Sequence, residues 1–243
     1  TARQAIEAFQ NCRAAGFQNI SIDLMYGLPG ETLSTWQQDL DQALLLHPEH
    51  LSAYHLIYEE DTVLWKLREQ HKVEEADEDL SVSLFSTLID RLTSEGYDHY
   101  EISNFSLPGL YSRHNSSYWT EKKYLGCGPS AHSYNGVSRQ WNVASLDTYI
   151  KGISAGTPVF EIEELDLYTR YNDFVITRIR TEWGMPLSKL RDEFGEKLYD
   201  YCLRMAAPHL KQGTLELVND ILKLTRKGIF ISDGIMSDML WTD

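Results

Sequence analysis

The stretch ISIDLMYGLPGETLSTWQQDLDQALLLHPEHLSAYHLI, residues 20–57, decides the fold. Apolar residues alternate over 20–24, which predicts a strand with one buried face. Apolar residues at helical spacing over 36–44 predict a helix after the GLPGET loop, and LSAYHLI, residues 51–57, predicts a second strand. Two strands joined by a helix should be parallel neighbours. The sequence therefore predicts an α/β protein.

Similar patterns extend on both sides of this unit. Residues 5–12 and 77–94 show helical spacing, with Gly16 and Gly96 as stop signals, and residues 98–103 predict a third strand. We therefore expect a βα array that holds ligands beyond the carboxyl ends of its strands. A closed barrel needs eight such units, and this chain begins in mid-unit with a helix. We expect a fragment whose earlier strands are missing.

The composition changes near residue 161. One helix is predicted to run through YTRYNDFVITRIR, followed by helices over 187–194 and 197–211 and a hairpin around Asn219 and Asp220. Helix, helix and hairpin is the order of a winged helix. We predict two domains, residues 1–155 and residues 156–243. The second helix offers few cations among apolar residues, which disfavours a DNA reader.

Charge and composition exclude several classes of protein. The chain has 243 residues, 42% of them apolar, with 22 basic and 36 acidic residues and a formal charge of −14. This charge opposes binding to phosphates, so no nucleic-acid partner is expected. No apolar run is long enough to span a bilayer and no leader peptide is visible, so we expect a soluble, cytoplasmic protein. The three cysteines are far apart, and each is expected to be a small buried residue.

The segment YEISNFSLPGLYSRHNSSYWTEKKYLGCGPSAHSY, residues 100–134, crowds aromatic rings, two histidines and a glycine-rich turn together. It predicts a binding surface for a planar, partly apolar ligand. His114, Asn115, Tyr118 and Trp119 fall within six positions and are the first candidates. In the alternative, His114 and Asn115 close a turn while Tyr118 and Trp119 belong to a core. His132, in the GPSAHS turn, is a second candidate ligand.

The segment DLMYGLPGET, residues 23–32, has a chemical logic of its own. Asp23 at a strand end could accept hydrogen bonds from two ribose hydroxyls, and the glycines permit a turn that a Cβ atom would obstruct. The alternative is a plain strand-to-helix turn, because glycine and proline are common in such loops.

Five ordered segments, DLMYGLPGET, LSAYHLIYEEDT, YEISNF, RHNSSYW and YLGCGPSAHSY, resemble the radical S-adenosylmethionine (SAM) family of oxygen-independent coproporphyrinogen III oxidase. The resemblance covers nearly the whole chain and is closest to the HemW-type heme chaperone branch. It implies the C-terminal part of a partial TIM-type (β/α) radical SAM barrel, followed by a small, mostly helical, winged-helix-like domain.

The resemblance also implies cofactors for a longer protein. Family members hold a [4Fe–4S] cluster on three cysteines of a CxxxCxxC-type loop, which this chain lacks, so it has no cluster ligands. The cluster and much of the SAM site would lie upstream. Asp23 resembles the ribose-contacting acid of the family, and Tyr54 and Ile57 match positions that line the adenosyl group. SAM is expected to bind only in the intact parent.

HNSSYW, residues 114–119, resembles the HNxxYW signature linked to heme in the chaperone branch. The resemblance implies that His114 ligates heme iron, that Tyr118 and Trp119 pack on the macrocycle, and that Asn115 orients the imidazole or meets a propionate. The implied function is to bind heme or porphyrin and deliver heme to apo-hemoproteins. Contact with a membrane is expected only through such partners.

Two other classes of function remain open. The parent could be a coproporphyrinogen III oxidase, which uses SAM and its cluster for a radical oxidative decarboxylation in porphyrin biosynthesis. The C-terminal domain could instead be an interaction module that docks a partner or covers the barrel mouth. We identify no catalytic residue in this chain and expect it to be inactive as an enzyme by itself.

Overall fold

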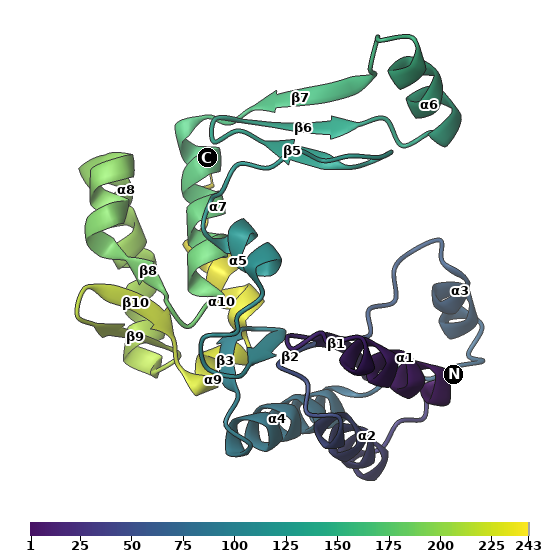
Figure 1. The fold of residues 1–243 in the computed structure, drawn as a ribbon. Coiled ribbons are helices and arrows are strands. Elements are labelled where there is room, and N and C mark those ends of the chain that lie inside the picture. The colour runs from purple at the N-terminus through teal and green to yellow at the C-terminus, as the bar shows by residue number, and fades with distance from the viewer. Residues whose placement is uncertain (243) are drawn as a thin grey trace. The chain divides into compact units, whose positions relative to one another are not determined.

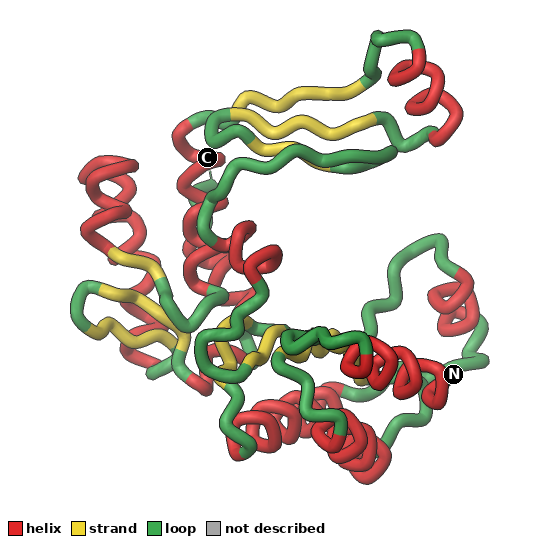
Figure 2. Tube along the Cα trace, viewed as in Figure 1, coloured by secondary structure: helices red, strands yellow, loops and turns green. Residues whose placement is uncertain are grey.

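A computed structural model describes residues 1–242 and divides the chain into two compact units, Thr1–Ser112 and Arg113–Asp243 (Figures 1 and 2). Each unit has its own sheets and core. The sequence predicts a domain boundary between residues 155 and 156, whereas the two compact units divide between Ser112 and Arg113. HNSSYW therefore belongs to the second compact unit. The assignment of residues 1–155 to a barrel with the motif segment, and of residues 156–243 to a winged-helix-like domain, stays a prediction.

The first unit alternates helices and strands along the chain before it ends in two short strands. Its elements are α1 (Ala2–Ala14), β1 (Ser21–Tyr26), α2 (Leu33–Leu45), β2 (His50–His55), α3 (Val63–Glu69), α4 (Glu78–Ser94), β3 (Asp98–Glu101) and β4 (Asn104–Ser106).

The four strands of this unit form one sheet in the order β1-β2-β4-β3. β1 and β2 are parallel with Ser21 opposite His50, which confirms the predicted parallel pair. β4 is antiparallel to both β2 and β3. The predicted third strand over 98–103 is wrong in its extent, because β3 ends at Glu101 and the chain reverses at Ile102 and Ser103 to return as β4. Since β4 is antiparallel to both of its neighbours, β3 runs in the same direction as β1 and β2 but is separated from β2 by β4. The part of the chain that the structure describes contains no closed barrel.

Helices α2 and α4 form the core of the first unit, and they lie side by side beneath the sheet in Figure 1. α2 buries the predicted stripe from Trp36 to Leu44, and the Trp36 indole Nε1 donates to the Leu84 carbonyl of α4 at 3.0 Å. Three leucines of the predicted α4 stripe are fully buried, and the Asp77 carboxylate caps the helix by accepting from the Leu80 amide at 2.7 Å. The buried stripe on each helix thus holds α2 and α4 in the core of the unit.

The second unit combines an antiparallel sheet in the order β5-β6-β7 with a helical part that contains the small sheet β8-β10-β9. Its elements are α5 (Arg113–Trp119), β5 (His132–Tyr134), β6 (Ser138–Asn142), α6 (Leu146–Ser154), β7 (Phe160–Glu164), α7 (Leu167–Ile179), β8 (Met185–Pro186), α8 (Leu187–Gln212), β9 (Leu215–Val218), β10 (Ile221–Leu224), α9 (Arg226–Ile229) and α10 (Ser232–Met239).

The helical part follows the predicted order. α8 is interrupted at Gly195, where φ is 80° and ψ is 172°, so it forms the two predicted helices. β9 and β10 pair around Asn219 and Asp220, and both turn residues have positive φ, as a two-residue hairpin turn requires. The Asp220 carboxylate also accepts from the Ser188 amide at 2.9 Å, which ties the turn to the start of α8.

The core of the helical part lies between α7, α8 and α10. Tyr171 and Phe174 of α7 are fully buried, and the Tyr171 hydroxyl donates to the Met239 carbonyl at 3.1 Å. Cys202 of α8 is buried there, but Cys12 and Cys127 are exposed, so the prediction of buried cysteines is wrong for these two. Among the described residues, no helix combines the length and apolarity needed to cross a membrane.

Candidate functional site

Helix α5 carries the HNSSYW motif on the second unit. His114 and Tyr118 lie one turn apart on one face, with the imidazole Nε2 3.3 Å from the phenol oxygen and the rings perpendicular at 5.2 Å. His114 is exposed, and Tyr118 keeps 39% of its surface accessible. Asn115 and Trp119 form the next pair along the helix and are half-buried. The four candidates therefore share one helix, with the imidazole open to solvent.

The indole ring of Trp119 packs against the guanidinium of Arg180. The guanidinium carbon of Arg180 lies 4.2 Å from the centroid of the indole, which is a cation–π contact. The indole Nε1 is buried and has no hydrogen-bond partner among the described residues. An unsatisfied buried donor is costly, so a ligand group that accepts from this N–H would gain stability.

A pocket of about 470 Å³ lies beside α5, a size within the usual range for small-molecule sites. Its walls come from α5 and the following loop, the β5–β6 hairpin, α7 and the first part of α8. The aromatic lining residues are Tyr118, Trp119, Tyr124, Tyr134 and Phe194; the charged ones are Glu121, Lys122, Arg139, Arg170, Asp173 and Glu193. This mixture of flat apolar walls and charged groups suits a planar ligand with acidic substituents.

Three phenols follow one another along one wall. The ring of Tyr118 meets that of Tyr124 at 5.1 Å in an edge-to-face contact, and Tyr124 lies 6.0 Å from Tyr134. Burial raises the pKa of both Tyr124 and Tyr134 above the ordinary value, so these phenols stay neutral at physiological pH. His114 continues this row beyond Tyr118.

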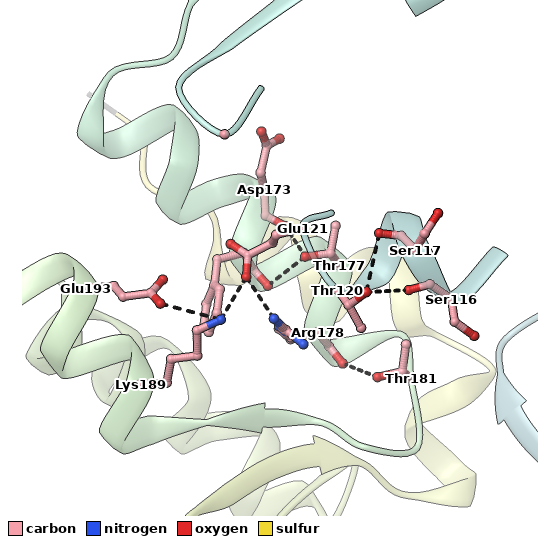
Figure 3. A network of polar contacts seen from close by, with 12 residues as sticks. Ser116, Ser117, Thr120, Glu121, Asp173, Thr177, Arg178, Thr181, Lys189 and Glu193 are labelled. Carbon is pink, nitrogen blue, oxygen red and sulfur yellow. Dashed lines mark hydrogen bonds and ion pairs between the residues drawn. The ribbon is translucent and has the colours of Figure 1, made fainter. Parts of the chain in front are cut away.

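Glu121, just after α5, is the centre of an ion cluster (Figure 3). One of its carboxylate oxygens accepts from Arg178 of α7 at 2.8 Å and from Lys189 of α8 at 2.9 Å. Lys189 also pairs with Glu193 at 3.4 Å. Burial pushes the pKa of Glu121 upward, but the two cations outweigh it and leave the pKa below its ordinary value. The cluster ties the end of the motif helix to α7 and α8.

A second charged pair also lines the pocket. Arg139 of β6 donates to the Asp173 carboxylate of α7 at 2.5 Å. Burial raises the pKa of Asp173 even though Arg139 opposes the change. This pair joins the β5–β6 hairpin to α7.

His132 lies in a different place from α5. It is exposed on β5, with its ring 5.9 Å from that of Trp141, and it lines a second pocket of about 350 Å³. The larger pocket beside α5 does not include it. His132 therefore lies at a different pocket from the one beside α5, and His114 itself lines neither of the two.

The candidate SAM residues lie on the first unit. Asp23 and Tyr54 are exposed on adjacent parallel strands, and Ile57 follows β2 with 70% of its surface accessible. Asp23 lies in mid-strand, opposite Ser52, so the expectation that it stands at the carboxyl end is wrong, because β1 continues to Tyr26. These side chains could contact a ligand from one side only.

The GLPGET loop is held by its own residues. The Glu31 carboxylate accepts from the amides of Gly27 at 2.6 Å and Leu28 at 3.2 Å. This is the geometry of the plain strand-to-helix turn. Within residues 1–242, no group of three or more His, Cys, Asp or Glu side chains is arranged to hold a metal ion.

Sequence reasoning missed the part of the pocket that α7 provides. Arg170, Asp173 and Thr177 recur at helical spacing and line one wall. The signal was a polar stripe within YTRYNDFVITRIR, opposite the apolar stripe that predicted the helix. Tyr124 and Tyr134 were inside the quoted aromatic segment but were not singled out.

Comparison with solved structures shows the class of fold. The chain superposes on the structure described as "Coproporphyrinogen III oxidase (HemN) from Escherichia coli is a Radical SAM enzyme", with a TM-score of 0.78 and 20% sequence identity over 97% of this chain and 58% of that one. The model of the HemN C-terminal domain matches residues 165–231.

Sequence comparison then gives the family. The chain is 32% identical to heme chaperone HemW of Mycobacterium tuberculosis (strain CDC 1551 / Oshkosh) and 28% identical to heme chaperone HemW of Bacillus subtilis (strain 168), over 98% of its own length in both cases. It spans 59% and 63% of the length of these two relatives. The chain belongs to the HemW and HemN-like family of radical SAM proteins.

Proposed function

We propose that this chain binds heme through α5 and the adjacent pocket, and that the whole protein delivers heme to apo-hemoproteins. The observation that carries the proposal is the exposed imidazole of His114 at the end of a row of phenols that lines a pocket of about 470 Å³. Relatives that carry the name heme chaperone HemW support it.

Each motif residue has a role that its surroundings allow. A neutral imidazole is a ligand for heme iron, and His114 is accessible for it. Tyr118 and the half-buried Trp119 line the pocket and offer ring faces to a macrocycle. Asn115, one turn before Trp119, is the polar residue that could orient the imidazole or meet a propionate.

The finer assignments concern the whole protein. In it, the first unit is the C-terminal part of a partial (β/α) barrel, and Asp23, Tyr54 and Ile57 complete a SAM site whose other residues and [4Fe–4S] cluster lie upstream. Residues 156–243 form a winged-helix-like domain. The likeness to the oxidase HemN, at 20% identity, supports the fold alone and does not favour oxidase activity.

Titration with hemin tests the site. We expect a saturable Soret shift for the wild-type chain and its loss in folded His114→Ala, because an iron ligand is removed. Thermal melts verify that each variant is folded. The substitution at His114 should change stability little, because the side chain is exposed.

Two histidine variants serve as controls. His132→Ala tests the second pocket and should leave the shift unchanged. His71→Asn removes an exposed histidine of the first unit, and Asn tolerates the φ of 53° at this position. An unaltered spectrum in His114→Ala, or no shift in well-folded wild type, would overturn the proposed site.

A further inference from the structure

The cations of the pocket differ in their partners. Arg139 is bound to Asp173, and Lys122 extends into solvent. Arg170 of α7 is half-buried and lines the pocket, yet its guanidinium makes no ion pair or hydrogen bond with any described residue. No nitrogen of Arg170 is among the buried polar atoms that lack a partner, so its guanidinium donors remain accessible to an anion that enters the pocket.

Asp173, the acidic residue closest in sequence to Arg170 on α7, does not form an ion pair with it. Asp173 lies three positions further along α7, on the same wall, but its carboxylate is committed to Arg139 at 2.5 Å. Glu193 pairs with Lys189, and Glu121 with Lys189 and Arg178. The acidic groups of the pocket are thus neutralised by other cations, and the positive charge of Arg170 is left over.

This charge acts inside the pocket. Burial raises the pKa of the Tyr134 phenol, the carboxylates of Glu121 and Asp173 raise it further, and the positive charges of Arg139 and Arg170 oppose the rise. Arg170 therefore lies close enough to influence Tyr134, at one end of the row of phenols that lines the pocket. An anionic ligand would otherwise be repelled by a chain with a net charge of −14.

We propose that Arg170 is the carboxylate-binding residue of this pocket, where it receives an acidic side chain of a flat macrocycle that packs along the phenol wall. The inference rests on the proposed heme site and adds the group that would hold its acidic edge. A guanidinium forms two parallel charge-assisted hydrogen bonds with a carboxylate, which gives orientation as well as affinity.

Metal-free porphyrins test this subsite independently of His114. The probes are deuteroporphyrin IX, which carries two propionates, and its dimethyl ester, which carries none, and binding to the full chain is followed by fluorescence in one detergent buffer. We expect Arg170→Ala to weaken binding of the free acid by about tenfold or more, the size of a charge-assisted hydrogen bond, and to leave ester binding unchanged.

Two further variants sharpen the result. Arg170→Lys keeps the charge without the planar fork and should recover part of the affinity for the acid. Arg191→Ala removes a cation of α8 that does not line the pocket and should change neither probe. Melting temperatures show that each variant is folded.

The outcomes separate this inference from the proposed function. Equal losses for acid and ester in Arg170→Ala would indicate a structural role and overturn the inference, as would equal acid binding by Arg170→Ala and wild type, or no acid binding by wild type. If hemin still gives a Soret shift that depends on His114 in any of these cases, the proposed function stands without this subsite.

Discussion

Glu121 shows how one residue positions the motif helix. Its φ of 56° lies in the left-handed region, and its carboxylate bonds Arg178 and Lys189 from two other helices. A non-glycine residue in that conformation needs compensation from its surroundings, and two charge-assisted bonds supply it. Glu121 thus connects the end of α5 to α7 and α8 through ion pairs.

We expect Glu121→Gln to reduce the free energy of unfolding by about 1–2 kcal/mol at pH 7. The folded-state pKa is lowered, so the stabilisation is present above the ordinary pKa of 4.5 and is lost as the pH falls through the folded-state value. Urea unfolding of both proteins at several pH values should therefore show curves that converge below pH 4.5.

Glu196→Gln is the matched control for this experiment. Its carboxylate pairs with Arg191 at 3.2 Å but is 65% exposed, and such surface pairs contribute little. A Glu121→Gln difference that is the same at all pH values would show that packing, and not the charge, stabilises this position.

The cysteines make a second prediction at the scale of single residues. Cys12 and Cys127 are exposed, whereas burial raises the pKa of Cys202 to about 11. The thiolate is the reactive form, so Ellman's reagent at pH 8 should modify two thiols rapidly in the native chain and the third only after denaturation. Rapid reaction of all three would contradict the packing of α8 against α7.

The turn after β1 carries a prediction about an element. Gly27 has a φ of 75°, and a Cβ there would lie 2.6 Å from Nε2 of His55. That imidazole is held by Ser81 at 3.0 Å and cannot easily give way. Gly27→Ala should therefore lower stability by about 2 kcal/mol or more, through backbone strain and a clash together.

Gly30→Ala separates the two causes, because Gly30 has a similar φ of 77° with open space around it. It should show the strain alone, about 1 kcal/mol. Equal losses for the two variants in thermal or urea unfolding would mean that His55 moves aside.

Elements with one-sided burial were predictable from the sequence. The buried stripes of α2 and α4 and the parallel pair β1–β2 follow from the spacing of apolar residues. The β9–β10 hairpin follows from Asn219 and Asp220, residue types that tolerate the positive φ of a two-residue turn. The return of the chain as β4 was missed, because Ile102 and Ser103 carry no glycine or proline signal and pairing with β2 decides the reversal.

The candidate site shows the same limit. The motif residues were visible because they are adjacent in the sequence, although nothing in HNSSYW showed that they form a helix. The pocket is made by α7, α8 and a hairpin distant in sequence, so Arg170 and Asp173 could not be joined to His114 by spacing. Tertiary contacts, and not local propensity, bring these residues together.

At the scale of the whole molecule, the proposed sites are separated between the compact units. His114 and every residue of the pocket belong to Arg113–Asp243, whereas Asp23, Tyr54 and Ile57 belong to Thr1–Ser112. The second unit has its own core, with fully buried aromatic residues in α7, and is large enough to fold alone. Heme binding should therefore not need the first unit.

We expect residues 113–243, produced alone, to bind hemin with the Soret spectrum and affinity of the full chain, because all groups proposed to contact the macrocycle are present. Residues 1–112 should give no saturable shift. Circular dichroism and melting curves establish that each piece is folded before titration. If a well-folded 113–243 gives no shift while the full chain binds hemin through His114, residues 1–112 must supply part of the site, and the pocket beside α5 is insufficient to hold the ligand by itself.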